Sequence, residues 1–291
     1  MRNARYWVPS FKTYVLRKRL YFRLKRMMDS DFNHRNKIFN IDSYSCPKTI
    51  PKIIWMYWKQ GENNAPELVK HCLKSWRKLN PDWDIRVLDD DTAKQYTGQL
   101  TLPPGITVQA YSDILRVNLL AQYGGVWADA TCYCARPLDY WLPALTQSGF
   151  FAFANPHPDR IISSWFLASE QNGTVIRTWK SAVDEYWKNT TKADHYLWLH
   201  YLFEYLTKHD KTIANLWEHT PKISADGPHI LKRALTTNGD VSRLGDTIAL
   251  DAIPVFKLTW KDDIPIGALD QLGRSRPRAA PIVPPSTVPA A

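Results

Sequence analysis

The stretch YSDILRVNLLAQYGGVWADAT, residues 111 to 131, constrains the fold of this chain more than any other segment. Ser112 is a good helix N-cap, Asp113 follows in the first turn, and the apolar residues after them predict a mostly buried helix. Gly124 can adopt the left-handed conformation that ends a helix. The short apolar run that follows favours a buried strand, so we expect the carboxylate of Asp129 at a strand end, where side chains converge on ligands.

The segments before this stretch predict alternating strands and helices. An apolar, β-rich run at 52–58 is expected as a strand, 67–79 as a helix that stops before Pro81, and 84–88 as a second strand. The acidic residues 89–91 are expected to cap a further short helix. This order predicts an α/β domain with a mostly parallel sheet and right-handed crossovers.

The segments after it are less regular. Residues 149–156 are expected as a buried strand, and 161–168, 175–187 and 193–208 as helices. The end of the chain is rich in Pro and Ala, has too little apolar surface to bury, and is expected to be disordered. We therefore divide the chain into a basic amphipathic arm, one central domain and a tail, at residues 1–45, 46–270 and 271–291.

Positive charge is concentrated near the N-terminus. The net charge is +10, and residues 1–40 hold eleven Lys or Arg against two Asp, whereas the rest of the chain holds 27 against 26. A basic protein can be a nucleic-acid binder, but charge confined to one arm, without a binding motif, argues against that partner. An anionic surface that the arm contacts is the better interpretation.

The arm has the spacing of an amphipathic helix over residues 11–28. Leu16, Leu20, Leu24 and Met27 form an apolar stripe, and most of the basic residues lie off it. We expect this helix to lie on an anionic membrane, with a solvated basic arm or a helix packed on the domain as the alternatives. Without a spanning segment or a secretory signal, we expect a cytoplasmic protein, peripheral on the inner face of the cytoplasmic membrane.

The four cysteines do not have the spacing of a zinc site. In a protein without an export signal they are expected to be reduced thiols.

The pattern SDxLRxxxLxxxGGxWxDxT resembles the core of the DXD-containing sugar transferases of the capsular-polysaccharide-synthesis type, and more distantly the large glucosylating toxins. IPKIIWMYWKQG at 50–61 and SWRKLNPDWDIRVLDDD at 75–91 resemble the first two strands of the same family. Two blocks in the right order are more specific than a lone Asp-x-Asp triplet, which is common in loops. The resemblance implies the GT-A fold, a Rossmann-like nucleotide-sugar-binding sheet with helical insertions.

The resemblance implies that Asp129 binds Mn²⁺ or Mg²⁺ and, through it, a nucleoside diphosphate; otherwise it is a solvated Asp at a strand end. Thr131 stands where the family has a second Asp. Its hydroxyl can coordinate a metal or hold a metal-bound water but brings no charge, so the cation is expected to bind more weakly.

Asp113 and Arg116 are three residues apart and share one helix face. Taken alone they would be a surface ion pair worth less than about 1 kcal/mol, whereas in the toxin-like relatives the matching residues hold the hydroxyls of the donor sugar. Trp58 matches an aromatic residue that contacts the nucleotide base, and packing in the core is its alternative. Trp127 has the same two interpretations.

Two later segments carry weaker candidates. Asp226 and His229 lie beside a Gly-Pro turn that resembles the acceptor side of the family, although His229 would otherwise be an ordinary exposed turn residue. The segment VFKLTWK at 255–261 resembles the one that closes over the diphosphate. There Lys257 could neutralise phosphate charge, and Thr259 or Trp260 could contact the leaving group.

These features predict a bacterial, membrane-associated glycosyltransferase of the hexosyl or N-acetylhexosaminyl kind. It would move a sugar from a nucleoside-diphosphate donor, UDP-linked, to a capsular or surface polysaccharide or a lipid-linked glycan, with retention of configuration as in the relatives. A toxin-like protein glycosyltransferase is one alternative. A non-catalytic sugar-nucleotide-binding or scaffold protein is the other.

Overall fold

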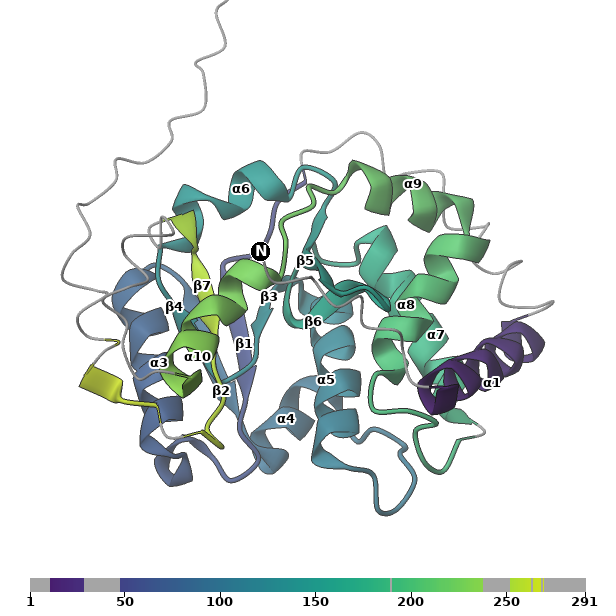
Figure 1. Cartoon of the computed structure of the whole chain (residues 1–291), viewed down its shortest axis with the longest axis horizontal. Helices are drawn as coiled ribbons and strands as arrows, with labels where there is room; N and C mark the ends of the chain where they lie inside the picture. Colours follow the sequence, from purple (N-terminus) through teal and green to yellow (C-terminus); the bar gives the residue numbers. More distant parts are fainter. Residues whose placement is uncertain are drawn as a thin grey trace, which may run out of the picture.

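A five-stranded sheet forms the centre of the molecule, in the order β2-β1-β3-β6-β5 (Figure 1). The structure is a computed structural model and describes residues 11–28, 48–188, 190–237, 252–262, 264–267 and 269. The tail predicted at 271–291 and residues 1–10 and 29–45 of the predicted arm lie outside the described residues. The fold below is therefore that of the predicted central domain and of one helix from the arm.

One half of the sheet is parallel. β1 (Ile53–Tyr57) pairs in parallel with β2 (Asp84–Leu88) on one side and with β3 (Gly125–Ala128) on the other. The connections are helical, made by α3 (Glu67–Leu79), α4 (Asp90–Thr97) and α5 (Val108–Tyr123). The α/β class is confirmed, and these three strands begin and end within one residue of their predicted bounds.

The other half of the sheet is antiparallel. β6 (Arg160–Ser169) pairs antiparallel with β3 and with β5 (Phe150–His157). The prediction of a helix at 161–168 is therefore wrong. Residues 162–169 are all buried, and an apolar run without an exposed face has no periodicity that separates a buried strand from a buried helix.

Helices cover both faces of the sheet (Figure 1). One apolar core joins Trp55 and Trp127 of the sheet to the helices on one side, which are α5, α7 (Thr174–Lys188), α8 (Trp198–His209) and α9 (Lys211–His219). A second core joins Ile54 and Val126 to α3 on the other side. Because both faces are covered, the central strands β1 and β3 carry no charged residue, as is usual for parallel strands buried on both faces.

Two consecutive glycines allow α5 to turn directly into β3. Gly124 ends the helix with φ +67° and Gly125 begins the strand with φ +94°, both in the left-handed region. A Cβ on Gly125 would lie 2.5 Å from the carbonyl oxygen of Ile53, and one on Gly124 would lie 2.6 Å from the backbone nitrogen of Gln171. Only glycine fits both this conformation and this close approach.

The N-terminus of α5 differs from the prediction. The helix begins a full turn earlier, and its N-cap is Thr107, whose hydroxyl accepts a hydrogen bond from the Ala110 backbone at 3.2 Å. Ser112 lies inside the helix, where its hydroxyl accepts from Arg116 at 3.1 Å. The prediction that Ser112 is the N-cap is wrong because a threonine five residues earlier offers the same capping chemistry.

A small second sheet extends this framework. β4 (Cys132–Cys134) follows directly after Asp129 and pairs antiparallel with β7 (Val255–Lys257), placing Cys132 opposite Lys257. α10 (Asp226–Thr237) packs on β7 through a third apolar core that contains Leu231 and Phe256. The short α6 (Leu142–Leu145) and two single-turn 3₁₀ helices, Glu62–Asn64 and Leu138–Tyr140, complete the described elements. β7 thus brings a late segment of the chain beside Asp129.

The basic helix of the arm, α1 (Phe11–Met28), packs against α8 (Figure 1). Leu20 and Leu24 are 1% and 0% exposed and belong to the core beneath it. Of the three interpretations of the arm, packing on the domain is the one the structure shows for this stripe. None of the helices in the described ranges is long and apolar enough to cross a membrane.

Three of the four cysteines lie in described positions. Cys72, Cys132 and Cys134 are buried and carry free thiols. Burial raises the pKa of Cys72 and, to about 12, that of Cys132, so these thiols are protonated and unreactive at neutral pH.

Candidate active site

A cavity of about 950 Å³ lies where β1 and β3 end. Its lining comes from segments far apart in the sequence, including the loop after β1, α5, the turn after β3, β6, α8, α10 and the segment after β7. Predicted site residues that line it are Trp58, Asp113, Arg116, Asp129, Thr131, His229, Lys257, Thr259 and Trp260. The fold therefore brings together most of the residues that the sequence singled out.

Asp129 lies at the end of β3, as predicted, and every contact of its carboxylate is with a donor or a cation. Oδ1 accepts a hydrogen bond from Trp127 Nε1 at 3.0 Å and lies 3.5 Å from the Arg116 guanidinium, while Oδ2 accepts from Lys257 Nζ at 2.8 Å. Burial alone would raise the pKa of Asp129, but Lys257 and Arg116 bring it below its usual range. The side chain is therefore a carboxylate at neutral pH.

Lys257 bridges the two residues predicted to hold a metal. Its ammonium donates to Thr131 Oγ1 at 2.7 Å as well as to Asp129 Oδ2. Burial lowers the pKa of Lys257, but Asp129 and Cys132 together outweigh burial and raise it, so the ammonium form is stabilised. The position between the predicted ligands is thus taken by a positive charge that belongs to the chain itself.

The residues present do not fit a divalent cation. Asp129 and Thr131 supply one carboxylate and one hydroxyl, and both are hydrogen-bonded to Lys257. A metal ion here would lie beside the two cations Lys257 and Arg116 and would have one anionic ligand from the protein. Among the described residues, no cluster of three or more His, Cys, Asp or Glu side chains could hold a metal.

Asp113 and Arg116 form a buried ion pair, so their interpretation as a surface pair is wrong. The two residues are 7% and 5% exposed, and their charged groups are 3.2 Å apart. Arg116 also donates to the carbonyl and hydroxyl oxygens of Ser164 at 2.7 and 2.8 Å, which fixes the guanidinium beside the cavity. Burial raises the pKa of Asp113 to about 7, opposed by Arg116 and assisted by the negative charge of Asp129.

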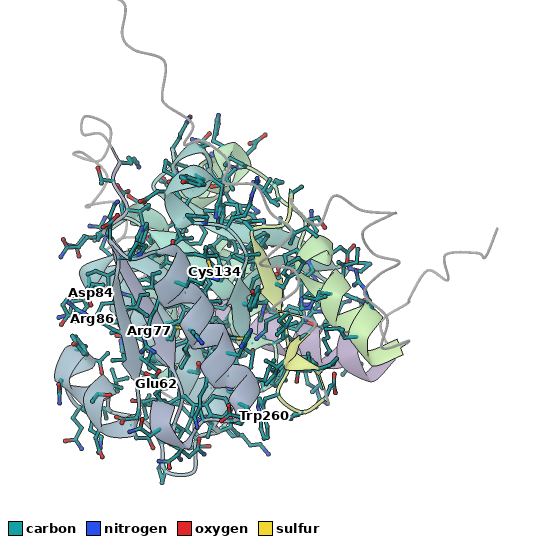
Figure 2. All side chains as sticks on the ribbon, turned by 90° about the vertical axis from the view of Figure 1, so that its left-hand side faces the viewer. Glu62, Arg77, Asp84, Arg86, Cys134 and Trp260 are labelled. Carbon is teal, nitrogen blue, oxygen red and sulfur yellow. The ribbon has the colours of Figure 1, made fainter. Side chains whose placement is uncertain are left out.

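Two tryptophans form one wall of the cavity. The rings of Trp58 and Trp260 meet edge to face with their centroids 5.8 Å apart. Trp260 is 49% exposed and lies at the molecular surface, as Figure 2 shows from the side of α3. The exposed ring of Trp260, packed on the partly buried Trp58, is a surface on which a planar ring can stack.

Trp127 does not line the cavity. It is fully buried, donates to Asp129 and lies with its ring 5.0 Å from the Arg116 guanidinium. The structure therefore places Trp127 behind the site, where it orients Asp129 and Arg116 rather than contacting a substrate.

The predicted Gly-Pro turn is the first turn of α10, a position that proline tolerates well. His229 points to the cavity from this helix, with its ring 5.8 Å from that of Trp165, so its interpretation as an exposed turn residue is wrong. Burial and the nearby cations, Lys257 first, lower its pKa to about 4, which makes it neutral at pH 7. Asp226 is exposed, pairs with Arg233 at 3.5 Å and does not line the cavity.

The sequence did not indicate a polar wall on the opposite side of the cavity. Ser163 and Trp165 on β6 and His200 on α8 line it, and each has a buried polar atom without a hydrogen-bond partner among the described residues. Trp58 Nε1 is a fourth such atom. Burial and the nearby Arg160 and Arg116 lower the pKa of His200 to about 3, so its imidazole is neutral. These four atoms have almost no accessible surface, so they lie behind the lining of the cavity and are not exposed to a ligand in it.

An α/β sheet whose central strand presents a carboxylate to a cavity, with basic side chains around it, is the architecture of the GT-A class of glycosyltransferases. The chain belongs to the family described as capsular polysaccharide synthesis proteins, whose model matches residues 12–268. This match covers α1 as well as the central domain.

Individual relatives are more distant. The chain is 26% identical to the O-glycosyltransferase braB of Annulohypoxylon truncatum over 170 residues, which are 50% of this chain and 40% of that protein. It is 27% identical to the initiation-specific alpha-1,6-mannosyltransferase of Saccharomyces cerevisiae, over 38% of this chain and 25% of that protein. It is 29% identical to inositol phosphoceramide mannosyltransferase 3 of Schizosaccharomyces pombe, over 42% of this chain and 38% of that protein.

The chain spans less than half the length of these three fungal relatives. Among solved structures, the PaToxG glycosyltransferase matches 72% of this chain and 86% of its own, with 17% identity and a TM-score of 0.40.

Proposed function

We propose that this protein is a glycosyltransferase that moves a hexose from a nucleoside-diphosphate sugar to a hydroxyl group of a glycan or lipid-linked acceptor. The observation that carries the proposal is the charge cluster at the base of the cavity, where Asp129 holds Lys257 and lies beside Arg116. Membership of the capsular family and the names of the relatives support the same reaction class.

The two walls of the cavity suit the two ends of such a donor. The edge-to-face pair of Trp58 and Trp260 offers an aromatic surface for the base. The pair of Asp113 and Arg116, which lines the cavity, offers an acceptor and donors for sugar hydroxyls. A UDP-linked donor follows from the family resemblance, and a GDP-linked mannosyl donor is tested beside it because two of the relatives above are named mannosyltransferases.

The reaction exchanges one bond at the anomeric carbon for another. The bond to the diphosphate oxygen breaks with its electron pair going to the diphosphate, the acceptor oxygen bonds to the same carbon, and the acceptor gives up its proton. Negative charge therefore develops on the leaving diphosphate, and positive groups placed to meet it lower the barrier. Retention, proposed from the resemblance, requires the acceptor to approach from the face that the diphosphate leaves.

In this proposal Lys257 supplies the positive charge that meets the leaving group. Its ammonium already lies where the resemblance expects Mn²⁺ or Mg²⁺, and Thr131 in place of a second carboxylate leaves that position with less negative charge. Arg116 adds a second positive charge 3.5 Å from Asp129. A divalent cation remains the prediction of the resemblance, and turnover in a chelator decides between the two.

The experiment measures hydrolysis and transfer of labelled UDP- and GDP-hexoses and N-acetylhexosamines by the full chain, with an alkyl glycoside as acceptor. We expect one donor to be turned over, also in EDTA, and turnover to fall at least 100-fold in Asp129→Asn. The control, Asp184→Asn, changes a surface ion pair with Lys180 on α7 and should leave turnover unchanged.

Other outcomes contradict the proposal in distinct ways. Donor binding without hydrolysis or transfer would support the non-catalytic alternative. Transfer of label from the donor into protein of a cell extract, and not into glycan or lipid, would support the toxin-like alternative. Activity that is lost in EDTA and restored by Mn²⁺ would show that turnover requires a divalent cation and that Lys257 has only an accessory role.

A further inference from the structure

The inner face of α1 is fully engaged with the domain. Arg17 donates twice to Glu204 of α8, at 2.5 and 2.7 Å, and Glu204 is 3% exposed. Arg23 donates to both oxygens of Asp194 at 3.0 and 2.9 Å. Leu20 and Leu24 are buried, so the apolar stripe that was expected to contact a membrane packs against the domain instead.

The outer face of α1 carries a second stripe. Tyr14, Lys18, Phe22 and Lys25 follow one another at spacings of four, four and three residues, which places them along one side of the helix. At 100° per residue the centre of this stripe lies about 140° around the helix from Leu20 and Leu24. Phe22 is 67% exposed and Tyr14 49% exposed, both unusually open for large aromatic side chains.

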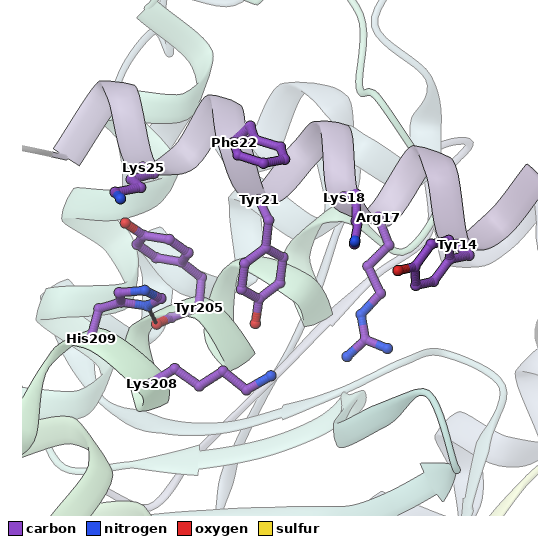
Figure 3. Close-up of a pocket in the computed structure, with 9 residues that line it drawn as sticks. All are labelled: Tyr14, Arg17, Lys18, Tyr21, Phe22, Lys25, Tyr205, Lys208 and His209. Atoms are coloured by element: carbon purple, nitrogen blue, oxygen red, sulfur yellow. Dashed lines mark hydrogen bonds between the residues drawn. The ribbon is translucent and has the colours of Figure 1, made fainter.

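A groove of about 340 Å³ runs beside this stripe, between α1 and α8 (Figure 3). Aromatic rings from both helices line it, namely Tyr14, Tyr21, Phe22 and Tyr205. Lys18, Lys25 and Lys208 stand at its rim, and among the described residues Lys18 and Lys25 form no ion pair. The face therefore combines exposed aromatic surface with an excess of positive charge.

We infer that this outer face of α1, with the adjoining groove, binds the surface of an anionic phospholipid membrane. Aromatic side chains are stable at the depth of lipid headgroups, where the ring is partly buried and a phenol hydroxyl stays wet. Lysines long enough to reach the headgroup phosphates add an attraction that falls away within a Debye length.

The shape of the stripe and its exposed aromatic ring favour lipid over the other anionic partners. The stripe is nearly straight along a single helix, which suits contact with a plane, and Phe22 remains 67% exposed although it lines the edge of the groove. Duplex nucleic acid would attract the lysines through its phosphates, but its phosphate backbone offers no apolar surface to cover this exposed ring. The residues that line this groove do not line the cavity, and the inference does not depend on the proposed reaction.

The test is flotation of the full chain with phosphatidylcholine vesicles that contain or lack phosphatidylserine. Wild-type protein should float with the anionic vesicles, and its binding should weaken in high salt. Lys18→Gln with Lys25→Gln should weaken binding roughly 30-fold, since each lysine near an anionic surface is worth about a factor of five. Phe22→Ser should weaken binding while leaving most of its salt dependence.

A matched control removes the same charge elsewhere. Lys74 and Lys78 are exposed on α3, four residues apart, at the opposite end of the molecule from α1 (Figure 1). Lys74→Gln with Lys78→Gln should float like wild type. Equal loss in both double variants would mean that overall charge, not this face, drives binding, and wild-type protein that stays unbound would overturn the inference. Donor hydrolysis in the same samples reports separately on the proposed function.

Discussion

The buried position of Asp113 changes the pKa of its carboxyl group. It lies on α5 with its carboxyl 3.2 Å from Arg116, yet burial raises its pKa to about 7, far above its ordinary value of 3.8. Near pH 7 its carboxyl group is therefore present both in the protonated form, which can donate a hydrogen bond, and in the ionised form, which only accepts. A carboxyl that accepts from sugar hydroxyls does so best when it is ionised, so the proposed donor should bind better above pH 7 than below it.

The same shift predicts a pH dependence of stability. The folded-state pKa of Asp113 is raised, so its contribution to stability is fully present below about pH 4 and is lost as the pH rises through about 7. Asp113→Asn should abolish this component, and the difference in free energy of unfolding between wild type and variant should change by a few kcal/mol over that window. Urea unfolding at several pH values measures it, and a constant difference would contradict the shift.

Lys257 is the second residue whose role can be tested alone. Lys257→Ala should lower turnover of the donor at least 100-fold, because neither the leaving group nor Asp129 then has the positive charge of Lys257 beside it. Lys257→Arg keeps the charge and should retain much more of the activity. If the alanine and arginine variants are equally impaired while both unfold like wild type, the positive charge at this position does not determine turnover.

Individual site residues were predictable where a motif surrounds them. Asp129, Asp113 and Arg116 lie in one contiguous block, so local spacing was enough to single them out. Ser163 and His200 lie on elements that meet only through the packing of α8 on β6, and no local pattern reveals such a meeting. The ten-residue run RIISSWFLAS, rich in branched and aromatic residues, was the one available signal for a strand at that wall.

At the scale of elements, the Gly124-Gly125 turn fixes how α5 meets the sheet. Gly125→Ala should lower the free energy of unfolding by about 3 kcal/mol or more, because it adds a clash with the Ile53 carbonyl to an unfavourable φ. Gly105→Ala is the matched control, since Gly105 has φ +78° but nothing within 4 Å of the added Cβ, and should cost only about 1 kcal/mol. Equal costs in urea unfolding would show that the close approach is unimportant.

Elements with one polar face were predicted well, whereas the long buried strand β6 was not. α3 was predicted to the residue because its apolar positions recur with helical period beside exposed Lys and Arg. β6 has no such contrast, and its assignment to a helix failed for that reason. α10 was taken for a turn because Gly227 and Pro228 are usual turn residues, although proline in the first turn of a helix is equally acceptable.

At the scale of the whole molecule, Glu204 joins the arm to the domain. Its carboxylate accepts from Arg17 and from Lys208 at 2.6 Å, and it is nearly buried while both cations are partly exposed. Glu204→Gln should weaken the docking of α1 by about 1 to 2 kcal/mol and raise hydrogen exchange in α1 without unfolding the sheet. Glu185→Gln, which alters an exposed pair with Lys188 on α7, is the control. Unchanged exchange in α1 would show that the apolar contacts of Leu20 and Leu24 suffice.

The overall architecture was predictable from the order of its first elements, but the placement of the arm was not. The excess of positive charge at the N-terminus indicated an anionic partner, whereas Arg17 and Arg23 are satisfied by acids of the same chain. A sequence shows which face of a helix is apolar, but it does not show whether lipid or protein will cover that face.

Lys257 and Asp129 are 128 residues apart in the sequence, yet the proposed chemistry requires them in direct contact. During synthesis the strand that presents the acid can form long before the lysine leaves the ribosome. Until that lysine has been synthesised, Asp129 has no ammonium group beside it, so the charge cluster of the proposed site is complete only when β7 has paired with β4.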